Sequence, residues 1–383
     1  MKFNRKQNKE LNPAVNILLL VLRLIFGGVF VFSGFVKLID PLGFSYKIQE
    51  YLMMFGGFFE IFKPLALLGA IGVCVAELVI GLNIMFNIRF RLSALAGLLF
   101  MLFFTPLTLY IAIASPISDC GCFGDAFTIT NTQTFIKNVF LLSIITTLFV
   151  ASKHIRPVFT PITEWIITAV FVLLGASFAL YNYRNLPIID FRPYRVGVNI
   201  LEAMTIPEGK PRDEYKITLI YEKDGVQQEF TLENFPRGET DWVFVDQKLT
   251  LISRGYQPSI TDFFIENEFF DDITEDILMF EGYTYLVIMY NINSAPERQI
   301  INAQKLYNRT LRSGNMQFYA LTGSSAADIE NVRNRTGITY PFATSNPTTL
   351  KTIIRSNPGV VLLKNGTIQA KWHWRNFDWE RSL

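Results

Sequence analysis

Five long apolar runs in the first half of the chain constrain the fold more than any other feature. Each run is close to the roughly 20 apolar residues that a helix needs to cross the hydrocarbon core of a bilayer. Half of the 383 residues are hydrophobic, and the mean hydropathy is positive. The sequence therefore predicts an α-helical, multi-pass membrane protein with the lipid bilayer as its first partner. The runs cover Val15 to Ile39, Pro64 to Phe86, Leu92 to Ala114, Phe135 to Ala151 and Ile162 to Tyr181.

Basic residues beside the spans predict their orientation. The clusters are Lys2, Arg5, Lys6 and Lys9 before the first span, Arg89 and Arg91 after the second, and Lys153, His154 and Arg156 after the fourth. In a five-span chain all three fall on one side, which the positive-inside rule makes cytoplasmic. The first run is too long for the core of a cleavable signal peptide, so we interpret it as a retained signal anchor. Residues 118–125 and everything after Tyr181 then face the periplasmic side of an inner membrane.

Charged residues inside the spans are costly and mark either a buried ion pair or a functional site. Arg23 lies about eight residues and Glu77 about ten residues from the cytoplasmic ends of their spans, a difference of roughly 3 Å, so we predict that they are partners. Small residues at spacings of three and four place each on a stripe that favours close helix packing. The stripes are Arg23, Gly27, Phe30, Gly34 and Lys37, and Ala70, Cys74, Glu77 and Gly81.

The intramembrane residues leave two interpretations open. The charges either lock the helical bundle or line a pocket for a ligand such as a quinone, for which Arg23, Lys37 and Glu77 are the candidate residues. Lys37 is near the extracytoplasmic end of its span, from which a lysine can snorkel to water. Cys74 is expected to be a small buried apolar residue.

The stretch "SDCGCFGD", residues 118–125, contains two of the three cysteines in the chain. A disulfide between Cys120 and Cys122 closes a very small, strained ring, and strained exposed disulfides are typically labile or catalytic. As a metal site the pair offers two thiolates, whereas tetrahedral zinc takes four ligands. The third interpretation is a tight turn, in which Gly121 and Gly124 supply backbone freedom. The candidate catalytic residues are Cys120 and Cys122.

The motifs "RLIFGGVFVFSGFVKL", "AELVIGL", "CGCFGD" and "TFIKNVFLL" resemble the DoxX/MauE group of four-helix membrane proteins over about residues 15–151. The resemblance implies a four-helix bundle and an association with redox chemistry and with disulfide formation in periplasmic partners. The residues that carry it are Arg23, Ser33, Gly34, Lys37, Glu77, Gly81, Cys120, Cys122, Phe123, Gly124, Lys137 and Asn138.

After the fifth span the composition becomes that of a water-soluble domain. "YKITLIYEKDGVQQEFTL" predicts a hairpin around a Lys-Asp-Gly turn, and "DWVFVDQKLTLISRGY" continues the β pattern. From Ser259 onward strands alternate with helices and end in the hairpin "GVVLLKNGTIQAKW". This order predicts an α/β sheet with at least one parallel pair.

The α/β pattern also resembles the thioredoxin superfamily, of the peroxiredoxin or thiol-disulfide reductase type. "ITDFFI" resembles its opening strand, and "NPGVVLLKNGTI" resembles the segment in which a cis-proline, here Pro358, precedes the last hairpin. The nucleophilic cysteine of that superfamily follows the strand "YTYLVIMY", where this chain has "NINSAPER". Because disulfide exchange needs a thiolate, we expect this domain to be a redox-inactive docking or scaffolding module.

The sequence therefore predicts four parts. They are a DoxX/MauE-like membrane domain (residues 1–157), a fifth transmembrane helix (158–186), a mostly β linker domain (187–258) and a thioredoxin-like domain without active-site cysteines (259–383). One hypothesis is a redox protein that exchanges disulfides or electrons through Cys120 and Cys122, passes electrons to a quinone and docks an extracytoplasmic protein partner. Another is a non-enzymatic, membrane-anchored binding or assembly subunit, and a third is a transporter of a small molecule. The formal charge of +2 does not favour a nucleic-acid partner.

Overall fold

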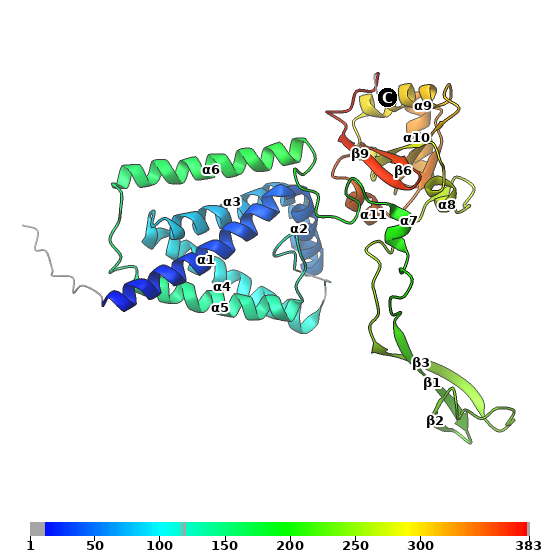
Figure 1. Cartoon of the computed structure of the whole chain (residues 1–383), viewed down its shortest axis with the longest axis horizontal. Helices are drawn as coiled ribbons and strands as arrows, with labels where there is room; N and C mark the ends of the chain where they lie inside the picture. Colours follow the sequence, from blue (N-terminus) through cyan, green and yellow to red (C-terminus); the bar gives the residue numbers. More distant parts are fainter. Residues whose placement is uncertain (1–11, 116, 118–119, 381–383) are drawn as a thin grey trace, which may run out of the picture.

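Five helices that are long and apolar enough to cross a membrane form the N-terminal part of the chain (Figure 1). The computed structural model describes residues 12–115, 117 and 120–380. All five predicted spans are confirmed, with ends that shift by a few residues. They are α1 (Pro13–Ile39), the 3-10 helix η1 (Gly57–Leu65) continuing into α3 (Ala66–Met85), α4 (Phe90–Ala114), α5 (Asn131–Ala151) and α6 (Pro161–Arg184).

Helices α1 and α3 approach each other closely through their glycines. A Cβ atom on Gly27 would lie 2.8 Å from the carbonyl oxygen of Gly81, and one on Gly34 would lie 2.7 Å from the backbone nitrogen of Leu78. Only glycine fits such contacts without moving a backbone. The prediction that the two stripes of small residues face each other is therefore confirmed.

A further helix that the sequence pattern did not predict, α2 (Pro41–Phe55), lies across one end of the bundle (Figure 1). It begins at Asp40, whose carboxylate accepts a hydrogen bond from the Gly43 nitrogen at 2.8 Å, with Pro41 in the first turn. It ends at Gly56, which has a positive φ of 61°. Its apolar pattern is too short and too interrupted to be read as a span.

A small antiparallel sheet protrudes from the rest of the soluble part (Figure 1). It consists of β1 (Glu214–Lys223), β2 (Val226–Thr231) and β3 (Val243–Ser253), in the order β2-β1-β3. The predicted hairpin is confirmed, since Lys223 pairs with Val226 across the turn. A short helix, α7 (Ile200–Met204), precedes the sheet.

The C-terminal part is an α/β domain around a six-stranded sheet in the order β4-β7-β6-β5-β8-β9. Strands β5, β6 and β7 are parallel, which confirms the prediction of a parallel pair, and β8 and β9 form an antiparallel hairpin beside β5. The strands are β4 (Glu266–Asn267), β5 (Tyr283–Met289), β6 (Met316–Thr322), β7 (Phe342–Thr344), β8 (Gly359–Lys364) and β9 (Thr367–His373).

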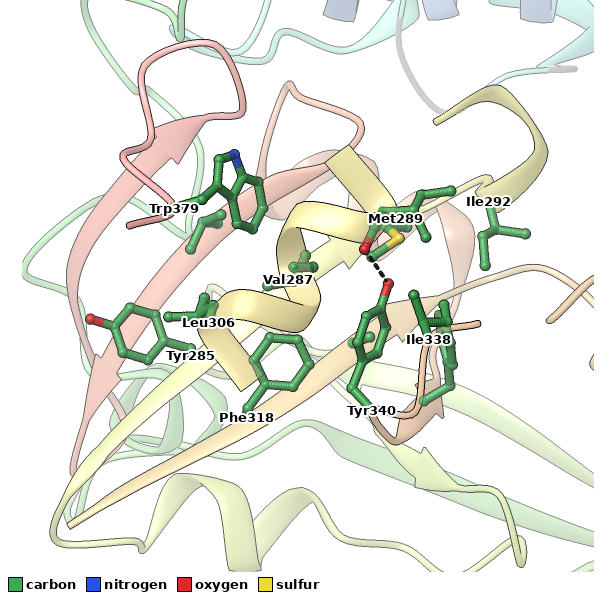
Figure 2. Close-up of a cluster of buried hydrophobic side chains, with 14 of the residues drawn as sticks. Tyr285, Val287, Met289, Ile292, Leu306, Phe318, Ile338, Tyr340 and Trp379 are labelled. Carbon is green, nitrogen blue, oxygen red and sulfur yellow. Dashed lines mark hydrogen bonds between the residues drawn. The ribbon is translucent and has the colours of Figure 1, made fainter. Parts of the chain in front are cut away.

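Helices cover both faces of this sheet. On one face α9 (Glu297–Thr310) and α10 (Ala326–Thr336) pack on a cluster that Figure 2 shows, in which the Tyr340 hydroxyl donates a hydrogen bond to the Ile300 carbonyl at 3.0 Å. On the other face α8 (Thr274–Leu278) and α11 (Pro347–Ile353) cover the second apolar cluster. Alternating residues of β5 point into the two clusters, so the strand is buried on both faces.

One prediction for this domain is wrong and one is confirmed. The stretch "ITDFFI", residues 260–265, is not a strand. Ile265 is buried, but its backbone nitrogen donates to the Thr274 hydroxyl at 2.9 Å instead of to a neighbouring strand, and β4 begins only at Glu266. The peptide bond between Asn357 and Pro358 is cis, as predicted.

Candidate functional site

The cysteine loop is held at the end of the bundle by hydrogen bonds from three helices. The Ser33 hydroxyl on α1 donates to the Cys122 carbonyl at 2.7 Å, and the Tyr51 hydroxyl on α2 donates to the Cys120 carbonyl at 2.8 Å. The Thr134 hydroxyl on α5 lies 3.4 Å from the Cys120 sulfur. The loop geometry is therefore fixed by the helical bundle, and not by the loop sequence alone.

The two thiols of the loop are adjacent and free. The Sγ atoms of Cys120 and Cys122 lie 2.7 Å apart. The pKa of Cys120 is lowered to about 6, mainly because the Cys122 thiol donates a hydrogen bond to it; burial opposes this effect, and Thr134 and Lys137 add to it. The same hydrogen bond, together with burial, raises the pKa of Cys122 well above its ordinary value. The lowered pKa of Cys120 favours its thiolate, which is the nucleophilic form of a cysteine, and the raised pKa of Cys122 favours its protonated form.

The thiols point into the helical bundle rather than toward the outer surface of the loop. The Cys120 side chain is buried, with 6% of its residue surface exposed, so the interpretation of the loop as an exposed thiol pair is wrong for Cys120. The reason is the left-handed backbone of Gly121 and Gly124, with φ of 65° and 52°, which turns the loop over so that the cysteines face the bundle. Thus the turn geometry and the thiol pair coexist in one loop.

A buried ion pair lies beneath the cysteines. The Lys37 ammonium on α1 contacts the Glu77 carboxylate on α3, and both side chains are almost fully buried. Lys37 and Glu77 line a cavity of about 50 Å³ together with Cys120 and Cys122. The expectation that Lys37 snorkels to water is wrong, because Glu77 supplies a partner inside the bundle. Lys37 also favours the thiolate form of Cys122, although its effect is smaller than that of burial.

The predicted pairing of Arg23 with Glu77 is wrong as well. Arg23 donates from Nε to the Ile84 carbonyl at 3.0 Å and from Nη2 to the Met85 carbonyl at 2.9 Å. It therefore satisfies the last carbonyls of α3, where a positive charge is also favourable to the helix dipole. Depth counted from the ends of the apolar runs was misleading, because the glycine contacts set the register of the two helices. Side chains lean toward the N-terminus of their helix, so Lys37 reaches back to Glu77.

Of the three candidate ligand-binding residues, Lys37 and Glu77 line the cavity at the ion pair. Arg23 lies at the other end of the α1–α3 contact, where it binds the carbonyls of Ile84 and Met85. Cys74 is fully buried in an apolar cluster with Leu38 and Val79, which confirms the prediction that it is a small buried apolar residue.

Within residues 12–115, 117 and 120–380, no group of three His, Cys, Asp or Glu side chains could hold a metal ion.

The α/β domain contacts the cysteine loop directly through Arg355, a residue that the sequence analysis missed. Arg355 follows α11 and donates from Nε to Asp40 at 2.7 Å and from Nη2 to Asp125 at 3.1 Å. Asp40 connects α1 to α2, and Asp125 ends the "CGCFGD" motif. Burial lowers the pKa of Arg355, but the two carboxylates raise it above its ordinary value, so the guanidinium stays charged. One side chain thus joins three segments that are far apart in the sequence.

Aromatic residues extend this contact. The hydroxyls of Tyr46 on α2 and Tyr290 after β5 are hydrogen-bonded at 3.2 Å, and the Lys351 ammonium lies 4.9 Å from the centre of the Tyr46 ring. A cleft of about 440 Å³ lies between α2, the cysteine loop and α11, and Gly121 and Gly124 form part of its wall. The position after β5, where thioredoxins carry their cysteine by the resemblance above, therefore faces α2. Nothing in the sequence around Arg355 or Tyr290 signals this contact, since it depends on docking of the domain.

These features define a multi-pass membrane protein with an α/β domain seated on the cysteine-containing end of its helical bundle. Residues 15–151 match the family described as Methylamine utilisation protein MauE, so the membrane part is of the MauE type. Residues 215–254, which form the protruding sheet, match a family described as a domain of unknown function (DUF8463). A comparison with curated proteins gave no match.

Proposed function

We propose that the protein is an inner-membrane thiol-disulfide exchange protein whose Cys120 and Cys122 react on the periplasmic side with a cysteine pair of a partner protein. The observation that carries the proposal is the adjacent thiol pair, in which the pKa of Cys120 is lowered to about 6 while that of Cys122 is raised. A low-pKa thiolate beside a second thiol is the arrangement that forms and resolves a mixed disulfide.

The exchange needs one co-reactant, a disulfide of the partner. The Cys120 thiolate attacks one partner sulfur, which forms a mixed disulfide and releases the other partner sulfur as a thiolate. Cys122 then loses its proton and attacks the Cys120 sulfur, which forms the Cys120–Cys122 disulfide and releases the second partner thiolate. Two electrons pass to the partner. The proton that Cys122 loses goes to one of the two released partner thiolates, and the other takes its proton from water. The reverse reaction oxidises a partner dithiol, and the relative reduction potentials set the direction.

Lys37 and Glu77 support the second step in this proposal. Cys122 holds its proton until the mixed disulfide forms, and Lys37 then stabilises the thiolate that attacks. Because Glu77 balances the charge of Lys37, the polar site is tolerated inside the bundle. Their role in this proposal is thus electrostatic, and the quinone pocket considered from the sequence stays a prediction.

The C-terminal domain serves in this proposal as a redox-inactive docking module with a thioredoxin-like fold. Support comes from the parallel strands β5, β6 and β7, the antiparallel β8–β9 hairpin and the cis-proline before β8. In this proposal residues 259–383 form this domain, 187–258 the β linker domain, 158–186 the fifth span and 1–157 the membrane domain.

The two basic connections, between α3 and α4 and between α5 and α6, lie together at one end of the bundle, since Asn87 donates to the Arg156 carbonyl at 2.8 Å. This contact supports a cytoplasmic assignment for that end.

Trapping of the mixed disulfide tests the proposal. The full chain in detergent micelles is incubated with a fluorescent peptide that contains one intramolecular disulfide. Cys122→Ser should accumulate a covalent adduct at Cys120 because resolution is blocked, whereas Cys120→Ser should give none. Cys74→Ser is the matched control and should behave as the parent chain. If Cys122→Ser forms no adduct, or if Cys120→Ser forms as much, the exchange function is rejected.

A non-enzymatic binding or assembly subunit is the second candidate, and the burial of Cys120 favours it. In that case the ion pairs and the loop serve only to seat the α/β domain. A chain in which both cysteines are serine would then retain its partner binding and its biological role in full. Loss of that role with unchanged stability supports exchange instead.

A further inference from the structure

Strand β3 is an exposed edge strand with an unusual distribution of apolar residues. All eleven of its residues are exposed, and in the described part of the chain it pairs only with β1. Val243 is 65% and Leu249 58% exposed. Long, apolar edge strands with free hydrogen-bonding groups template the pairing of another strand, and proteins usually cover or charge them.

Aromatic side chains at the distal end of the small sheet pack on one another. Tyr221 and Phe230 on β1 and β2 pack with Phe235 and Trp242 of the connection before β3, and Tyr221 also contacts Phe244 of β3. The aliphatic residues of β3 are left exposed, and they are Val243, Val245, Leu249, Leu251 and Ile252.

The sequence of β3 is chemically symmetric about Gln247. In "VFVDQKLTL", residues 243–251, an acid precedes the central glutamine and a base follows it, and aliphatic residues flank both. When two such strands pair antiparallel around a two-fold axis at Gln247, residues at equal distances from it lie opposite each other. The opposed pairs are Val243 with Leu251, Val245 with Leu249, Asp246 with Lys248, and Gln247 with itself.

We propose that β3 is a homodimer interface, through which a second copy of this chain extends the sheet from three to six strands. Each dimer contains two Asp246–Lys248 pairs, and opposite charges across neighbouring strands stabilise a sheet. The β1–β3 register shifts between Ile220 and Tyr221, opposite Val245, and again between Glu214 and Tyr215, opposite Ile252. The regular run of β3 therefore extends from Asp246 to Leu251 and contains the charged centre, whereas Val243 and Val245 lie before and at the first shift. This interface is independent of the thiol chemistry proposed above, because the sheet lies outside the MauE-type segment.

Cysteine cross-linking tests the register. Directly opposed strand residues have Cα atoms about 4.5–5.5 Å apart, which is within disulfide range. In the full chain carrying Cys74→Ser, Cys120→Ser and Cys122→Ser, Gln247→Cys should form a disulfide-linked dimer under mild oxidation. Thr250→Cys is the control on the same strand, since position 250 faces Phe244 of the other copy, and it should cross-link far less. Equal cross-linking at both positions, or none at Gln247→Cys, overturns the proposal.

Charge exchange tests the contact without cysteines. Lys248→Glu turns each of the two Asp246–Lys248 pairs of the dimer into two facing carboxylates. This change should raise the dimer dissociation constant by about tenfold. Adding Asp246→Lys restores opposite charges and should return the constant to near the parent value. Light scattering of the full chain in micelles measures the mass. A chain that is monomeric at every concentration overturns the proposal. That result would leave another protein or a lipid surface as the occupant of β3.

Discussion

Lys37 and Arg355 are both buried basic side chains, but they are stabilised in different ways. Lys37 lies inside the helical bundle and has one carboxylate partner, Glu77. Arg355 lies where the α/β domain meets the bundle and contacts two carboxylates, Asp40 and Asp125. Loss of one partner leaves Lys37 as an uncompensated charge in an apolar medium, whereas each carboxylate at Arg355 is partly accessible to water. Breaking the bundle pair should therefore destabilise the fold, whereas breaking the interface cluster should mainly weaken the docking of the α/β domain against the cysteine loop.

The largest effect is expected from breaking the bundle pair. Lys37→Met leaves Glu77 buried and unpaired and should lower the free energy of unfolding by about 3–5 kcal/mol. The double variant Lys37→Met with Glu77→Met removes both charges and should recover most of that loss. Thermal unfolding in micelles measures both. A double variant as unstable as the single one would show that the pair is not the cause.

Breaking the interface cluster should have a smaller effect on stability and a specific effect on the loop. Arg355→Met removes hydrogen bonds to charged groups, worth about 1.5–3 kcal/mol, and weakens docking of the domain. We expect the alkylation rate of the loop cysteines to rise by about tenfold or more. Arg335→Met, which breaks an exposed pair with Glu297, is the control and should change little. If the loop cysteines of the two variants are alkylated at equal rates, Arg355 does not control access to the loop.

The pH dependence of Cys120 distinguishes the site from an ordinary thiol. Because its pKa is about 6, the thiolate is already present at pH 7, and its alkylation rate should fall about tenfold between pH 7 and pH 5. A thiol with an ordinary pKa loses reactivity from about pH 9 downward instead. Peptide mapping of the parent chain by mass spectrometry, which separates alkylation at Cys120 from alkylation at Cys122, gives the profile. A midpoint near 9 would remove the main support for the exchange function.

The smallest effect is expected from the hydroxyl beside Cys120. Thr134→Val keeps the shape of the side chain but removes the contact to the Cys120 sulfur, so the midpoint of the alkylation profile should move upward by less than about one pH unit. Thr146→Val, on the exposed side of the same helix, serves as the control. A downward shift for Thr134→Val would contradict the assigned hydrogen bond.

The sequence was informative about elements and about some contacts. The periodicity of glycine at positions 27, 34 and 81 correctly predicted which faces of α1 and α3 meet, because close packing leaves a local signature in small residues. The sequence did not predict the charge partners correctly, because the depth at which two side chains meet depends on the register of the two helices. It also missed α2 and Arg355, whose roles arise from docking.

By itself, the sequence determined the five spans, the β hairpin, the α/β order of the C-terminal part and the positions of the cysteines. These follow from local patterns of hydrophobicity, turn residues and composition. Only the tertiary structure decided that Lys37 pairs with Glu77, that Cys120 and Cys122 face inward, and that Arg355 connects the α/β domain to the cysteine loop. Those contacts join residues up to 315 positions apart, and their geometry depends on how the helices and the domain pack.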